Sequence, residues 1–156
     1  VYVAGSAVGE GHLYQGETVF VDYDSVNGGR RREFRKVLRT GGTGVFQGKI
    51  LGGKGAQKTD GYQISQALLL DEDARFLAKP ELEIYADDVA CSHGSTSGAI
   101  DEDALFYLRS RGIPAGPAAD LLTLAFLAEA IAEIDDPAIA AEIHTRLEGW
   151  LERRRG

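Results

Sequence analysis

The glycines of this chain are concentrated in its first half, and this distribution constrains the fold more than any other feature. Fourteen of the 20 glycines fall within the first 61 residues, whereas Gly149 is the only one between Gly116 and the last residue. Glycine suits turns and is disfavoured inside helices. The stretch after about residue 100 is rich in alanine and leucine, which favour helix. We therefore expect two structural units, residues 1–100 and 101–156.

The first unit is predicted to consist of many short strands. Short apolar or alternating runs separated by turn residues are typical of strands, and such runs lie at 18–21, 37–38, 45–50, 67–70 and 82–85. Only residues 71–77 resemble a helix between them, which argues against parallel folds that need a crossover helix for each strand. A sandwich, a barrel and a β-solenoid remain open, and no clean sequence repeat selects the solenoid.

The second unit is predicted to contain three helices. Asp101 suits the N-cap of a helix that ends before Gly112, with Arg109 and Arg111 at its negative end. A second helix is expected over 117–134, and a third begins at Pro137 with Asp136 as its N-cap. A unit of this size is marginal alone. Its apolar surface should pack against the first unit or bind a second protein.

Charge and cysteine content exclude several classes of protein. The net charge of -7 argues against non-specific nucleic-acid binding. A single cysteine forms no internal disulfide, and no apolar run approaches the length of a membrane span, so we expect a protein of a reducing compartment with no membrane partner.

One basic cluster stands out, and it comprises Arg30, Arg31, Arg32, Arg35, Lys36 and Arg39. We interpret it as a solvated loop and strand edge, with a partner or phosphate contact as the alternative.

Cys91 and His93 are the best candidates for chemistry. They lie two residues apart in an alternating run, so a strand would present both side chains on one face. Thiolate and imidazole both ligate zinc or iron, but two ligands do not complete a site, so this interpretation needs ligands from another subunit. The alternative is a buried structural cysteine beside a hydrogen-bonded histidine. Catalysis by Cys91 with His93 as base is disfavoured by their separation along the strand. His12 and His144 are interpreted as structural.

Two other patterns are weaker. Residues 48–55 nearly match a phosphate-binding loop, but Gly55 replaces the required Ser or Thr and no helix follows, so nucleotide binding is rejected. Acidic residues gather at 71–73, 87–88 and 101–103. Turn and helix-cap roles explain them best, and the alternative is a β-solenoid enzyme that acts on carbohydrate through paired carboxylates.

Several motifs in a fixed order resemble the SufB/SufD family of iron-sulfur cluster assembly proteins. They are Gln57-Lys58-Thr59-Asp60-Gly61-Tyr62-Gln63, Leu68-Leu69-Leu70, the run Pro80 to Val89, Cys91-Ser92-His93-Gly94, and the run Leu105 to Ile113. The chain lacks the cysteine-rich pattern of SufB, which favours the SufD branch. The resemblance implies a right-handed parallel β-helix, a β-solenoid, followed by a small C-terminal α-helical domain. It also leads us to expect a piece of a longer protein.

The resemblance further implies a non-enzymatic scaffold subunit, in the bacterial cytoplasm or the plastid stroma, that pairs with a SufB-like paralogue and binds a SufC-like ATPase. His93, with Cys91, is then expected at the interface where partner ligands complete a nascent iron-sulfur cluster, with no cofactor held stably by the chain alone. A homodimeric structural module is the remaining alternative. The ATPase contact is expected at Leu105, Phe106, Tyr107, Arg109, Arg111, Leu121 and Leu124.

Overall fold

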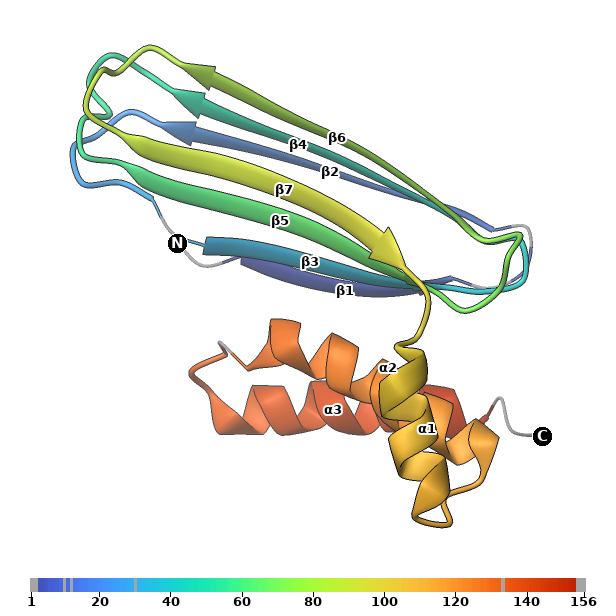
Figure 1. Cartoon of the computed structure of the whole chain (residues 1–156). Coiled ribbons are helices and arrows are strands. Elements are labelled where there is room, and N and C mark those ends of the chain that lie inside the picture. The colour runs from blue at the N-terminus through green and yellow to red at the C-terminus, as the bar shows by residue number, and fades with distance from the viewer. Residues whose placement is uncertain (1–2, 10, 12, 30, 133, 154–156) are drawn as a thin grey trace.

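A run of strands precedes a run of helices in the computed structural model (Figure 1). The structure describes all residues except 1–2, 10, 12, 30, 133 and 154–156. The strands within the described residues are β1 (Val3–Gly9), β2 (Tyr14–Tyr23), β3 (Arg31–Leu38), β4 (Thr43–Gly52), β5 (Asp60–Leu69), β6 (Arg75–Ile84) and β7 (Ala90–Gly98).

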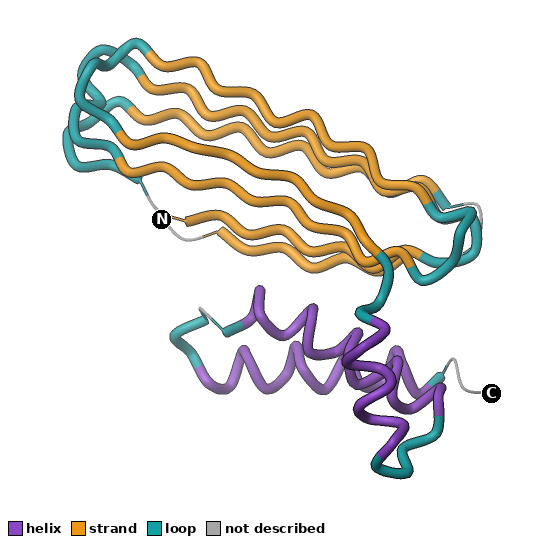
Figure 2. Tube along the Cα trace, in the orientation of Figure 1, coloured by secondary structure: helices purple, strands orange, loops and turns teal. Residues whose placement is uncertain are grey.

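The strands form a parallel β-solenoid of about three turns. Alternate strands join two sheets, which we call sheet A (β1-β3-β5-β7) and sheet B (β2-β4-β6), and every ladder is parallel. Loops connect the two sheets at both ends of the strands (Figure 2). This arrangement confirms the β-solenoid among the three architectures that the strand pattern left open.

The helix considered for residues 71–77 is wrong. Asp71 lies in a turn, where its carboxylate accepts a hydrogen bond of 2.7 Å from the backbone N–H of Thr40. The chain then enters β6 at Arg75, which pairs in register with Thr43 of β4. Because these contacts come from the preceding turn of the solenoid, they override the local helix pattern.

The apolar core lies between the two sheets. Phe34 of β3 and Phe46 of β4 pack against each other across it, with tilted rings whose centroids lie 4.8 Å apart, and Leu38 and Ile50 are fully buried. Alternate residues of β4 are buried, as expected for a strand with one face inward. At the corner before β3, Gly29 has φ +113, and a Cβ there would overlap the Asp60 carbonyl, so only glycine fits.

The interpretation of the basic cluster as a solvated strand edge is wrong. β3 lies between β1 and β5 rather than at an edge, and Arg32, Arg35 and Lys36 are at most 6% exposed. Arg32 and Lys36 face the solenoid interior, whereas Arg35 faces the helices. Arg31 and Arg39 keep exposed side chains, and Arg30 lies outside the described residues. Burial of these charges depends on distant partners that a local charge pattern does not reveal.

Three helices follow the strands: α1 (Glu102–Ser110), α2 (Ala115–Ile131) and α3 (Pro137–Glu152). The predicted N-caps are confirmed, because Asp101 accepts from the N–H groups of residues 103 and 104 and Asp136 from those of 138 and 139. α2 begins two residues earlier and ends three residues earlier than predicted. Its N-cap is Pro114, which provides no side-chain hydrogen bond and leaves no cap signal to read.

The helices pack on the outer face of sheet A, through α2 (Figure 1). Leu127 of α2 is fully buried against Val37 of β3 and Leu68 of β5. Beside this contact, Arg35 forms ion pairs with Glu33 at 2.6 Å and with Glu129 of α2 at 2.5 Å, and it donates to the Phe126 carbonyl. The helical unit is therefore docked on its own solenoid, as one of the two expectations had it.

Truncating Leu127 tests this docking. Leu127→Ala removes a fully buried side chain between α2 and sheet A, so we expect the free energy of unfolding to fall by about 2–5 kcal/mol. Leu121→Ala, at a 48% exposed position of the same helix, should change it by less than about 0.5 kcal/mol. Equilibrium urea unfolding followed by circular dichroism measures both. Equal losses would show that α2 is not anchored through Leu127.

Candidate functional site

Cys91 and His93 lie together at the last turn of the solenoid. β6 and β7 are the end strands of their sheets, so no further turn formed by the described residues covers them. Cys91 pairs in register with Gly61 and His93 with Gln63. The Cys91 sulfur lies 3.3 Å from where a Gly61 Cβ would stand, so it faces the interior, and the strand alternation gives His93 the same face. Cys91 is half-buried and His93 is exposed.

This geometry contradicts the alternative of a buried structural cysteine beside a hydrogen-bonded histidine. Neither side chain is fully buried, because the solenoid ends at β7. Within the described part of the chain, no group of three or more His, Cys, Asp or Glu side chains is placed to hold a metal ion. A thiol and an imidazole at an open end suit iron or zinc as two ligands of a shared site. Completion by another subunit stays a prediction.

A buried arginine adjoins Cys91. The Arg32 guanidinium donates a hydrogen bond to the Tyr23 hydroxyl and lies 5.0 Å from the centre of its ring. Burial lowers the pKa of Arg32, and the charge interaction with Cys91 offsets part of this shift. The Tyr23 ring also lies 3.6 Å from the Cβ position of Gly61, beside the Cys91 sulfur. Tyr23, Arg32 and Cys91 therefore form one cluster at the start of the sheet A strands.

Tyr23 and Arg32 were not predicted as neighbours of Cys91, and Gln63 was not predicted beside His93. The available signal was the alternation along each strand. Tyr23, Arg32 and Gln63 all take inward-facing positions, where polar residues are unusual. Reading that signal requires the strand register, which pairs residues about 30 positions apart.

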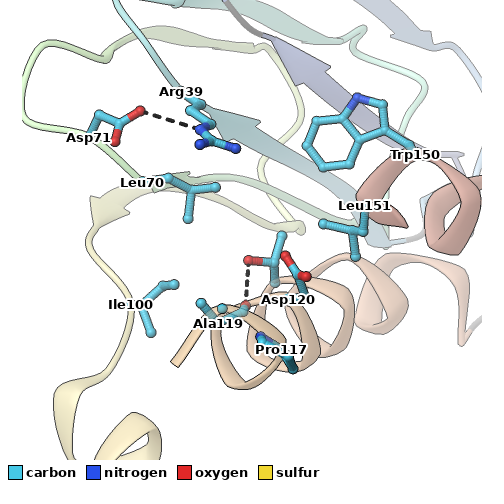
Figure 3. A pocket seen from close by; sticks show the side chains of 11 residues that line it. Arg39, Leu70, Asp71, Ile100, Pro117, Ala119, Asp120, Trp150 and Leu151 are labelled. Atoms are coloured by element: carbon cyan, nitrogen blue, oxygen red, sulfur yellow. Dashed lines mark hydrogen bonds and ion pairs between the residues drawn. The ribbon is translucent and has the colours of Figure 1, made fainter. Parts of the chain in front are cut away.

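A second feature is a cavity at the opposite end of sheet A (Figure 3). It measures about 470 Å³ and lies between the ends of the sheet A strands and the helices. Arg39 and Asp71, 3.8 Å apart, lie on the solenoid side, and Pro117 and Trp150 on the helical side. Because Cys91 and His93 lie at the start of β7, whereas Ile100 of the cavity follows the end of β7, the two features are separate.

The comparisons with known proteins identify the family. Residues 1–126 match the family model described as SUF system FeS cluster assembly, SufBD core domain. The chain belongs to the SufB/SufD family. It is 40% identical over 117 residues to the iron-sulfur cluster assembly protein SufD of Escherichia coli, a match that covers 75% of this chain and 28% of that protein.

Two further relatives agree. The SufD protein of Bacillus subtilis is 34% identical over 112 residues (72% of this chain, 26% of that protein). The chloroplastic protein ABCI7 of Arabidopsis thaliana is 35% identical over 125 residues (79% of this chain, 26% of that protein). The chain spans about a quarter of the length of these relatives. Its similarity to SufD agrees with the branch predicted from its motifs.

In this SufB/SufD family chain, the residues expected to bind an ATPase lie on α1, just after it, and on α2. α1 has no buried residue, and Phe106 and Tyr107 are 74% and 54% exposed. Arg111 stacks on the Tyr107 ring at 3.6 Å, Arg109 lies beside Phe106 in a shallow pocket, and Leu105 is half-buried. On α2, Leu121 is exposed and Leu124 is half-buried, and both line a small groove against α3.

The remaining candidates occupy structural positions. Asp87 and Asp88 lie in the turn between β6 and β7, and the former phosphate-loop candidate forms the end of β4 and a turn. His144 pairs with Glu148 at 3.4 Å on the half-exposed face of α3, and His12 lies outside the described residues. Among the residues that the structure describes, none of the helices combines the length and apolar character that a membrane span requires.

Replacing Tyr23 tests the cluster around Arg32. Tyr23→Phe removes the hydroxyl that accepts from a buried guanidinium, so we expect the free energy of unfolding to fall by about 1–3 kcal/mol. Tyr14→Phe, at an outward-facing and 68% exposed position of the same strand, should change it by less than about 0.5 kcal/mol. Chemical denaturation of both variants measures the difference. If Tyr23→Phe leaves the free energy of unfolding unchanged, the Arg32 guanidinium does not depend on the Tyr23 hydroxyl.

Proposed function

We propose that this chain is part of a non-enzymatic scaffold subunit in a Suf-type iron-sulfur assembly complex. Family membership supports a role in cluster assembly. The observation that carries the finer proposal is the position of Cys91 and His93, which face inward at an uncovered solenoid end. A SufB-like paralogue covers that end, and its side chains complete the ligand set for the nascent cluster, which is cargo rather than a resident cofactor.

The uncovered end of the solenoid, at β6 and β7, has features that are typical of a protein interface. The free edges of β6 and β7 carry backbone N–H and C=O groups available for pairing, and the inward side chains of β6 are only partly buried. Covering this end would bury His93 and Cys91 together, which strengthens their interaction with a metal by excluding water.

The helical unit is the proposed contact for a SufC-like ATPase. α1 projects from the fold with all its apolar side chains at least partly exposed, and Arg109 and Arg111 flank its aromatic residues. Exposed aromatic and arginine side chains are typical of the energetically important centre of an interface. The relatives named for bacteria and chloroplasts support the bacterial cytoplasm or the plastid stroma as the compartment.

His93→Ala tests the proposed ligand. In the complete complex we expect cluster formation to fall by about tenfold or more, because a metal ligand is lost. The melting temperature of the chain should stay unchanged, because His93 is exposed. Iron and acid-labile sulfide are measured after anaerobic purification, with His144→Ala as the matched histidine control. Normal cluster formation by His93→Ala would remove the histidine from the function.

Phe106→Ala tests the proposed ATPase contact. Phe106 is the most exposed of the large apolar side chains named for this surface, and we expect its removal to weaken ATPase binding by about tenfold or more. Phe20→Ala removes a phenylalanine of similar exposure from the outer face of sheet B and should leave binding unchanged. Calorimetric titration with the SufC-like ATPase measures both. Equal affinity of the two variants would exclude α1 from the contact.

A further inference from the structure

The solenoid interior holds polar atoms that have no hydrogen-bond partner among the described residues. Both amide atoms of Gln63, the Nε and Nη1 atoms of Arg32 and the Ser65 hydroxyl are buried without a hydrogen bond to any residue that the structure describes. Each of these side chains is 1% exposed. Burying unpaired polar atoms destabilises a fold, and apolar side chains of similar size would fill the same space at lower free energy. Their presence indicates a requirement other than stability.

Strand register places Gln63 between Arg32 and His93. Arg32 of β3 pairs with Gln63 of β5, and Gln63 pairs with His93 of β7. Neighbouring strands lie about 4.8 Å apart, a distance that a glutamine side chain is long enough to span. Sheet B leaves room for this amide at Gly48, where a Cβ would overlap it. Of the three residues in this row, only His93 is exposed at the open end.

We infer that Gln63 is a positioning residue for His93. When a partner covers the last turn, Gln63 Oε1 accepts the N–H of the imidazole, Arg32 donates to the same oxygen from the other side, and Gln63 Nε2 donates to the Ser65 hydroxyl. This arrangement fixes one tautomer of His93 and leaves the lone pair of the other ring nitrogen free for iron. Histidine ligands are commonly oriented by such an acceptor. The inference rests on the proposed role of His93.

The test uses the complete protein in complex with its SufB-like partner. Gln63→Met keeps the shape of the side chain and removes the acceptor, whereas Gln63→Glu keeps the acceptor beside Arg32. Gln66→Met is the matched control, because Gln66 is an outward-facing glutamine of the same strand that donates to Thr96. The ring ¹⁵N shifts of His93 report its tautomer, and titration with Fe²⁺ reports its availability as a ligand.

For Gln63→Met we expect a mixture of His93 tautomers and an affinity for Fe²⁺ that is about tenfold weaker. The melting temperature of the complete protein without its partner should rise by about 2 °C or more in Gln63→Met, because the buried amide has no hydrogen-bond partner among the described residues when the end is uncovered. Gln63→Glu and Gln66→Met should both keep the wild-type tautomer. A substitution that raises the melting temperature and weakens Fe²⁺ binding is not expected at a residue whose role is structural.

Two results overturn the inference. One is a Gln63→Met complex with the wild-type tautomer and Fe²⁺ affinity. The other is a lower melting temperature of Gln63→Met in the absence of the partner, which would mean that the amide already stabilises the uncovered fold. His93→Ala is measured in parallel to separate the two proposals. Loss of cluster formation in His93→Ala together with normal behaviour of Gln63→Met contradicts the positioning role alone, whereas normal cluster formation in His93→Ala contradicts the proposed function as well.

Discussion

Burial of β3 on both faces is the constraint on which the rest of the structure depends. Its inward side chains Phe34 and Leu38 complete the core between the sheets, and its outward side chains Arg35 and Val37 hold α2. One strand thereby couples the solenoid to the helical unit. A change that displaces β3 would alter both the open end, through Arg32, and the helical surface, through Arg35.

The buried charges on the two faces of β3 differ in how well nearby groups compensate them. On the outer face, Arg35 is surrounded by Glu33, Glu129 and the Phe126 carbonyl, so its desolvation is offset by charge-assisted hydrogen bonds. On the inner face, Lys36 approaches Glu17 at 3.4 Å, and Arg32 has the Tyr23 hydroxyl. The compensated charge of Arg35 lies where the helices and the solenoid are joined, whereas the less compensated Arg32 lies in the row of paired residues that leads through Gln63 to His93.

Local sequence predicted the features that depend on neighbouring residues. The N-caps Asp101 and Asp136 act within three residues of themselves, so they could be read directly. The solenoid repeat could not, because the register offset changes from 29 between Tyr14 and Thr43 to 32 between Thr43 and Arg75. Burial of Arg35 was equally hidden, since its partner Glu129 lies on α2, far along the sequence. The family resemblance resolved an architecture that periodicity left open.

The candidate site was only half predictable for the same reason. Alternation along one strand was enough to place Cys91 and His93 on a common face. Their neighbours Arg32 and Gln63 come from two other turns of the solenoid, and a basic or amide side chain on a strand normally indicates a solvated face. In a solenoid, inward positions of successive turns line up, so one polar residue in each turn produces a continuous interior row. A row that begins at a buried arginine and ends at an exposed histidine connects the protected interior to the end where a partner would bind.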